Sequence, residues 1–234
     1  MCQHKLLFLS ICATIIYYKT GEIMKKDYVF FKKDLNNDLD KLSKFLLTKY
    51  EEINTQSLKG ANITKVNEET DAFVDSKSVS TIKYKEYNVF QFYNEEIYNL
   101  FLGVKDTVRQ ACQYYEYDFE EQKFMIQGWF NVNYNKLGKL NFHNHGPKGI
   151  KGPIFHGYYS VNAEPSETIY IIDDKEIINL NKNNCLMISS AGNLHAMKDW
   201  EWEGPRITIA YDIIPLKFLI KNNKQAMQQH WIPL

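Results

Sequence analysis

The sequence lacks an excess of charge of either sign, with 28 basic and 28 acidic side chains among its 234 residues. A neutral chain offers no electrostatic reason to bind nucleic acid or a membrane surface, so neither partner is expected. Cysteine is also scarce, and Cys2, Cys12, Cys112 and Cys185 form no Cys-x-x-Cys pair. This scatter argues against a disulfide framework and a zinc knuckle, and it favours a reducing, cytoplasmic setting.

The apolar stretch from Leu6 to Tyr18 is too short for a comfortable membrane span. It follows Lys5, so one interpretation is a signal peptide that exports the protein. We favour another, because the Gly21-Glu22 codons can spell a bacterial ribosome-binding site and Met24 begins a typical start of a soluble protein. Residues 1–23 are therefore expected to be a leader that precedes a native start at Met24.

The chain does contain enough apolar residues for a core, at 44% of the total, and their spacing changes along the sequence. Apolar residues recur every three or four positions over 33–58 and from Glu95 to about Tyr115, which predicts two helices. The polar stretch 59–82 is expected to be a loop, with room for a short strand. Residues 24–122 are thus expected to be a helical support region.

After residue 123 the pattern becomes one of short β-branched or aromatic segments separated by turn residues. Strands are predicted at Phe124–Tyr134, His156–Val161, Thr168–Ile172, Cys185–Ser189 and Arg206–Ile214. Helices followed by a run of strands predict a mainly β fold, with a sandwich or jelly-roll core braced by N-terminal helices. The core is expected to cover 123–234, within one structural domain overall.

Three histidines form a candidate metal site. His143 and His145 are two residues apart, so on an extended chain their imidazoles point to the same side and can reach one ion. His195 comes just past a predicted strand and could close the site from a neighbouring strand. Two or three ligands on one face of an iron ion leave open positions for a bidentate cosubstrate and for oxygen.

The last predicted strand alternates between two faces. One face carries three isoleucines and Tyr211, and the other carries Arg206, Thr208, Ala210 and Asp212. A charge buried inside a sandwich without a partner is costly. Because a guanidinium fork matches a carboxylate and a hydroxyl adds a donor, Arg206 and Thr208 predict a buried anion.

These stretches resemble the Fe(II)/2-oxoglutarate-dependent oxygenases, especially their prolyl-hydroxylase-like branch. The resemblance covers roughly residues 125–216 and is carried by 129–134, Gly138, His143-Asn144-His145, 156–161, Leu194-His195 and 206–211. It implies a double-stranded β-helix (cupin-like) core with iron at the mouth of the barrel. It also implies that His143 and His195 bind the iron, and that Arg206 and Thr208 bind the C5 carboxylate of 2-oxoglutarate.

The sequence departs from this family at one motif position, where His145 stands in place of Asp or Glu. His145 could be the third ligand, as in the three-histidine face of thiol dioxygenases. It could also leave a two-histidine site of the kind seen in halogenating relatives. We expect a working site in which His143, His145 and His195 bind the metal, with one more unit of positive charge than the usual set.

Other residues are expected near this site. Asn131, Asn133 and Tyr134 lie on a strand that should face the barrel. Contact with the cosubstrate is expected, by Asn131 and Tyr134 above all, with packing and backbone hydrogen bonding as the alternative. His156 is expected to be packed or to support the ligands. The segment Gly146–Pro153 is expected to form a loop over the mouth, or simply a solvated connection.

The implied activity is a hydroxylase that couples oxidative decarboxylation of 2-oxoglutarate to oxidation of a substrate C–H bond. It would use Fe(II), molecular oxygen and ascorbate as a reductant, on a small-molecule or peptidyl substrate. One alternative is a three-histidine iron dioxygenase independent of 2-oxoglutarate, which would have no evident need of a buried Arg206. Another is a non-catalytic jelly-roll binding module, which the loss of the acidic ligand favours.

Overall fold

The computed structural model describes residues 30–57, 79–81, 87–134, 142–146, 152–198, 204–222 and 230–234. The expected leader at 1–23 lies outside these residues. So do most of the expected loop at 59–82 and the middle of the expected mouth loop at 146–153.

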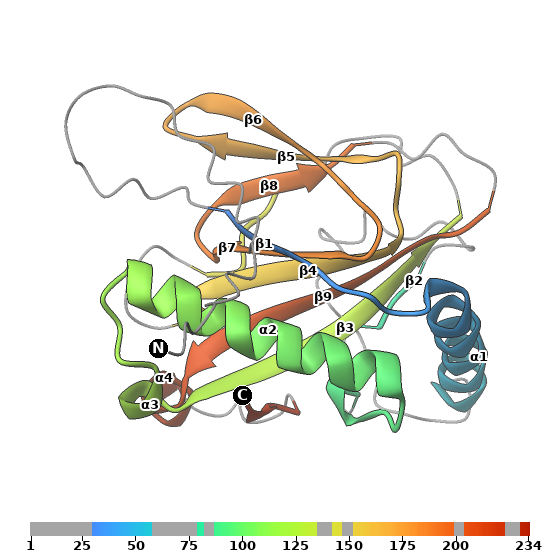
Figure 1. Ribbon diagram of the computed structural model, residues 1–234, viewed down its shortest axis with the longest axis horizontal. Coiled ribbons are helices and arrows are strands. Elements are labelled where there is room, and N and C mark those ends of the chain that lie inside the picture. Colours follow the sequence, from blue (N-terminus) through green and yellow to red (C-terminus); the bar gives the residue numbers. More distant parts are fainter. Residues whose placement is uncertain are drawn as a thin grey trace, which may run out of the picture.

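Two antiparallel sheets form the centre of the protein (Figure 1). The strands are β1 Phe31–Asp34, β2 Val79–Ser80, β3 Phe124–Asn133, β4 Phe155–Asn162, β5 Glu167–Ile172, β6 Lys175–Leu180, β7 Cys185–Ser190, β8 Leu194–Met197, β9 Arg206–Pro215 and β10 Ile232–Pro233. The larger sheet has the order β1-β7-β4-β9-β3-β10, with β2 also paired to β3, and the smaller sheet has the order β6-β5-β8.

The chain winds between the two sheets as a double-stranded β-helix does. From β3 in the larger sheet it passes to His143, which forms an isolated antiparallel bridge with His195 of β8. It then returns to the larger sheet at β4, enters the smaller sheet at β5 and β6, and alternates again through β7, β8 and β9. The segment around His143 therefore extends the smaller sheet, and it faces the centre of the larger one.

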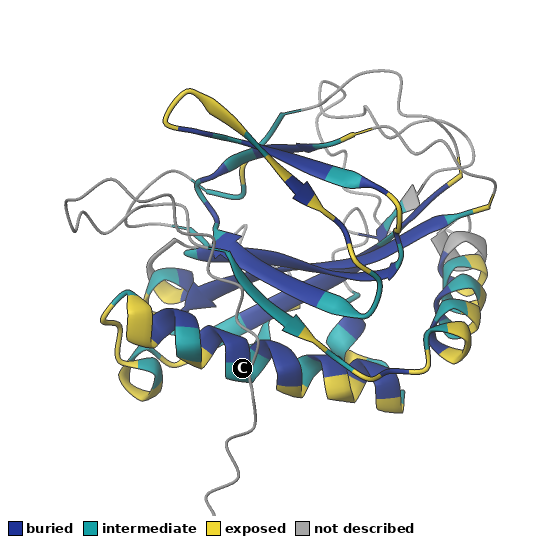
Figure 2. Ribbon diagram, turned by 45° about the horizontal axis from the view of Figure 1, so that its top comes forward, coloured by how far each residue is buried: buried dark blue, intermediate teal, exposed yellow. Residues whose placement is uncertain are grey.

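Helices cover the outer face of the larger sheet. They are α1 Leu39–Ser57, η3 Val89–Gln91, α2 Glu95–Tyr114, α3 Phe119–Gln122 and α4 Leu216–Asn222. The Asn94 side chain caps α2 by accepting a hydrogen bond from the backbone N–H of Ile97, and Glu95 and Glu96 lie in the positive first turn. Figure 2 shows buried residues along the larger sheet and along the side of α2 that faces it.

Each face of the larger sheet belongs to a different core. Ile207, Ile209 and Tyr211 of β9 are fully buried in a large apolar cluster shared with α1 and α2. Ala210, on the other face of β9, belongs to a second cluster between the sheets with Trp129 and Tyr158. The predicted alternation of this strand is confirmed, and it directs the even-numbered residues of β9 into the barrel.

Most of the predicted elements are present. The mainly β fold is confirmed, and β3, β4, β5, β7 and β9 correspond to the five predicted strands within one or two residues. The second predicted helix is α2, and the expected short strand in the N-terminal loop is β2. No helix in the described ranges is long and apolar enough to span a membrane.

The prediction of a helix over 33–58 is wrong at its start. Phe31–Asp34 is strand β1, which pairs with β7 so that Phe31 lies opposite Ile188. The backbone of this segment therefore hydrogen-bonds to β7 and forms an edge strand of the larger sheet. Helix α1 begins only at Leu39. The Asn and Asp residues in between compete with helical hydrogen bonds and favour a helix start after them.

Strands β6 and β8 also lie outside the predicted set. β5 and β6 form a hairpin whose two-residue loop, Asp173-Asp174, has φ of 50° and 58°. Left-handed residues at both positions suit the twist of a hairpin, and Asp tolerates them better than most residues do. The Asp173-Asp174 pair was therefore the sequence feature from which a hairpin, and with it β6, could have been predicted.

Gly157 tests how tightly β4 packs against its neighbours β7 and β9. A Cβ there would overlap the carbonyl oxygen of Met187 and the ring of Tyr211. We expect Gly157→Ala to lower the free energy of unfolding by about 2 kcal/mol or more, because neither neighbour can move freely. Chemical denaturation followed by circular dichroism measures this change.

Gly103→Ala in α2 is the matched control. Its nearest neighbour would be the flexible end of Leu35, at 2.8 Å, and alanine favours a helix. Its free energy of unfolding should stay within about 1 kcal/mol of the wild type. Equal losses in the two variants would contradict the packing argument for Gly157.

Candidate functional site

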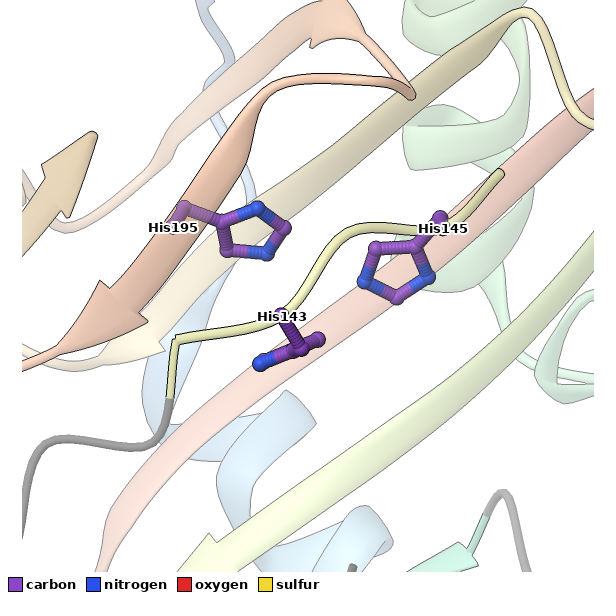
Figure 3. A group of neighbouring side chains, drawn as sticks. All are labelled: His143, His145 and His195. Carbon is purple, nitrogen blue, oxygen red and sulfur yellow. The ribbon is translucent and has the colours of Figure 1, made fainter. Parts of the chain in front are cut away.

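The structure brings the three predicted metal ligands together. The ligand atoms of His143, His145 and His195 all lie within 4.8 Å of one another. Figure 3 shows the three rings converging, two from the segment before β4 and one from β8. Reciprocal backbone hydrogen bonds of 3.0 and 2.9 Å join His143 and His195, and His145 donates its backbone N–H to Ala191 at 2.9 Å. The sheet therefore fixes the backbone that carries all three rings.

The spacing of the rings suits a shared ion. With metal–nitrogen bonds of about 2.1 Å, two imidazoles on one tetrahedral or octahedral ion have centroids about 4.6 to 5.3 Å apart. The centroids of His143 and His195 are 4.6 Å apart, and those of His145 lie 5.3 Å from both. The centroid spacing is therefore compatible with a single metal ion, with the rings of His145 and His195 within 11° of parallel.

The protonation of His195 also suits metal binding. Its Nδ1 lies 3.0 Å from the carbonyl oxygen of Asn193, which can only accept a hydrogen bond. The proton is therefore on Nδ1, and Nε2 keeps its lone pair. Burial, with a smaller contribution from the neighbouring histidines, lowers the pKa of His195 well below its usual value, so the ring is neutral at neutral pH. Neutral imidazole is the form that binds metal.

A second group of ligand types overlaps the first. His145, His156 and Asp212 also place ligand atoms within 4.8 Å of one another. The Nδ1 atoms of both histidines contact Asp212 Oδ1, at 3.1 Å from His145 and 2.9 Å from His156. The alternation of β9 placed Asp212 on the inward face, but no motif singled it out, and sequence reasoning missed its contact with the histidines.

His156 is packed, as expected, and it lies against His145, one of the predicted ligands. It is 4% exposed, and its ring stacks on that of His145 with centroids 3.6 Å apart and planes 11° apart. Burial, together with the neighbouring His145, lowers its pKa to about 4. We name His143, His145, His156 and His195 the histidine cluster.

Arg206 lies at the other end of the inward face of β9. It is 4% exposed, and its Nε donates a hydrogen bond of 3.1 Å to Ser166 Oγ. Burial lowers its pKa to about 10, so it remains a cation at neutral pH. Within the described part of the chain no carboxylate pairs with it, which leaves a buried positive charge in need of an anion.

Further polar groups surround Arg206. On the neighbouring strands, Asn133 lies opposite Arg206, and Asn131 and Ser160 lie on either side of Thr208. The amide of Asn131 donates to Thr208 Oγ1 at 3.4 Å. Among the described residues, Asn133 Nδ2 and Ser160 Oγ are buried without a hydrogen-bond partner. We call these five residues the anion pocket, since their unused donors suit a carboxylate.

Tyr134 is the one predicted site residue that the structure does not bring to this group. It follows the last residue of β3 and is 37% exposed. Partial burial and the nearby Tyr50 and Glu51 of α1 raise its pKa, which places it on the helical side of the larger sheet. Asn133, one residue earlier, takes the inward position instead.

Comparison with known proteins bears on the fold. No protein-family model and no curated protein matches the chain. Among solved structures, a prolyl hydroxylase from Trichoplax adhaerens, in complex with a peptide fragment of hypoxia inducible factor, is 10% identical with a TM-score of 0.55. That likeness covers 85% of this chain and 88% of the hydroxylase.

A candidate oxygenase from Shewanella oneidensis is 11% identical with a TM-score of 0.50, over 82% of this chain and 83% of that one. At identities this low, structural similarity is evidence of a shared fold alone. The double-stranded β-helix predicted for this chain is therefore confirmed, in the form that prolyl hydroxylases and related 2-oxoglutarate/Fe(II) oxygenases have.

Proposed function

We propose that this protein is an Fe(II)- and 2-oxoglutarate-dependent dioxygenase that hydroxylates a small molecule or a peptide. One observation carries the proposal: a single barrel contains both a three-histidine ligand set and a buried Arg206 with no acidic partner among the described residues. A metal site alone fits many chemistries. A metal site together with a cationic carboxylate pocket fits an oxo acid as cosubstrate.

Each part of the site has a proposed role. His143, His145 and His195 would hold Fe(II), the latter two through Nε2, and Arg206 with Thr208 would bind the C5 carboxylate of 2-oxoglutarate. Together, bound Fe(II) and 2-oxoglutarate supply oxidative decarboxylation coupled to the oxidation of a C–H bond. The protein orients the oxo acid, because its fixed guanidinium holds one end while the metal ligands leave room at the other.

The anion pocket also excludes water from the cosubstrate. All of its side chains except the partly exposed Asn131 are buried, and the unpaired donors of Ser160 and Asn133 would find acceptors on the bound oxo acid. Charge-assisted hydrogen bonds are stronger in such an environment than in water. Selectivity for a dicarboxylate would follow, because a monocarboxylate would leave Arg206 buried without an anion.

Two other functions explain less of the structure. A three-histidine dioxygenase without 2-oxoglutarate would use the histidine cluster and leave the anion pocket without a purpose. A non-catalytic binding module would need neither the convergent rings nor the buried Asp212 beside them. The free thiols of Cys112 and Cys185 support a cytoplasmic location for the proposed enzyme.

The first test concerns the metal. We expect the wild type to bind one Fe(II) or Co(II) ion per chain under anaerobic conditions, measured by equilibrium titration. His143→Ala and His195→Ala should each weaken binding at least about 100-fold, because each removes a ligand. His230→Ala, an exposed histidine near the C-terminus, is the control and should bind as the wild type does. Absence of binding by the wild type would favour the binding-module alternative.

The second test concerns the cosubstrate. Anaerobic protein with Fe(II) should develop a weak visible charge-transfer band when 2-oxoglutarate is added. Arg206→Gln should weaken 2-oxoglutarate binding about 100-fold, since two charge-assisted hydrogen bonds contribute about 3 kcal/mol together. Its affinity for Fe(II) should not change.

Arg109→Gln, on the exposed face of α2, is the matched control for loss of one guanidinium. It should leave the band as it is in the wild type. A band of equal strength in Arg206→Gln would contradict the assigned pocket. Iron binding without any band in the wild type would favour the dioxygenase that is independent of 2-oxoglutarate.

A further inference from the structure

We infer that Asp212 is the positioning residue of the metal centre, holding His145 and His156 by their Nδ1–H groups. From β9 it supplies the negative charge that is missing at motif position 145. This inference rests on the metal-binding part of the proposed function. It assigns a role to a strand residue that lies outside the motif.

The contacts come from three parts of the fold. Asp212 lies directly opposite His156 in the pairing of β9 with β4. His145 reaches the same carboxylate from the segment before β4, with its Nδ1 3.1 Å from Oδ1 and 3.2 Å from Oδ2. His156 completes the set with its Nδ1 2.9 Å from Oδ1. Both rings are therefore tied to one buried carboxylate.

These contacts fix the tautomer of His145. An ionised carboxylate only accepts hydrogen bonds, so both Nδ1 atoms carry the protons. The lone pair of His145 is then on Nε2, on the side of the ring away from Asp212. In Figure 3 that side faces His143 and His195.

The geometry argues against Asp212 as a direct ligand in the second group. A metal ion lies close to the plane of each imidazole that it binds. The rings of His145 and His156 are stacked face to face, 3.6 Å apart and within 11° of parallel, so no ion can lie near both planes. Hydrogen bonds to a shared oxygen tolerate this arrangement better.

The carboxylate also changes the charge of the site. Three neutral imidazoles leave the two positive charges of Fe(II) uncompensated, whereas the usual motif carboxylate would cancel one of them. Asp212 restores that charge from behind His145. A carboxylate that accepts a hydrogen bond from a ligating histidine orients the ring and makes it a better donor to the metal. Stacked His156 restrains the same ring from turning.

The test compares Asp212→Asn in two backgrounds. In the wild-type background, the loss of the carboxylate should weaken Co(II) binding about 10- to 100-fold, with one ion still bound per chain. In a His145→Asp background, which returns a carboxylate to the motif, Asp212 would repel the new ligand. There Asp212→Asn should leave the affinity unchanged or improve it.

A tautomer measurement gives an independent readout. In the apo wild type, ¹⁵N shifts of the histidine rings should show the proton of His145 on Nδ1. In Asp212→Asn the two tautomers should mix, because an amide can donate as well as accept. Asp174→Asn, in the exposed turn between β5 and β6, is the control for the change of charge and should alter neither readout.

Three outcomes would overturn the inference. One is an equal loss of affinity in both backgrounds, which a purely structural role of Asp212 predicts. Another is a second bound ion that Asp212→Asn removes, because Asp212 would then be a ligand. The third is an unchanged tautomer of His145 in Asp212→Asn. If the wild type binds no metal at all, the proposed function fails, which distinguishes that result from these three.

Discussion

The alternation of β9 is the constraint on which the rest of the structure depends. This strand lies between β3 and β4, and all of its residues are buried. One face is apolar and packs against the helices, which fixes the register, because a slip of one residue would turn every side chain to the opposite face. The other face is thereby forced to carry Arg206, Thr208 and Asp212 into the barrel. The hydrophobic packing of the outer core thus determines where the charges of the site lie.

The two charges on this face do not neutralise each other. Arg206 and Asp212 are six residues apart on one strand, so their Cα atoms are roughly 20 Å apart at about 3.4 Å per residue. Each must therefore find its own partner in a medium where an unpaired charge is costly. Asp212 has two imidazole N–H groups, whereas Arg206 has only Ser166 among the described residues. Among the described residues the strand leaves this cation without an anionic partner, which is the physical basis for the proposed carboxylate ligand.

Periodicity explains which features the sequence predicts and which it hides. Period-two alternation located β9 and the inward face of Arg206 and Thr208, and a stripe of period three to four located α2. β1 escaped notice because four residues are too few to show a period. β6 escaped because its pattern is inverted, with Ile178 and Leu180 exposed and Asn179 buried. The spacing of the histidine motif picked out three candidate ligands that the structure brings together. The partnership of Asp212 with His145 depends on how the segment before β4 crosses β9, which no local pattern records. Tyr134 was misplaced because it is three residues from Asn131, and residues an odd number apart on a strand point to opposite faces.

The exchange of a motif carboxylate for His145 is less disruptive than the motif alone implies. A carboxylate is still present beside the site, but it has moved behind the ring, so its charge acts through a hydrogen bond. An all-imidazole set is neutral and accepts several divalent metals, among which imidazole alone discriminates weakly. Retention of iron would then depend on charge at close range, and Asp212 is the nearest ionised group to His145 in the described structure. It follows that β9 would serve both ends of the proposed reaction, because it holds the oxo acid through Arg206 and steadies the metal ligands through Asp212.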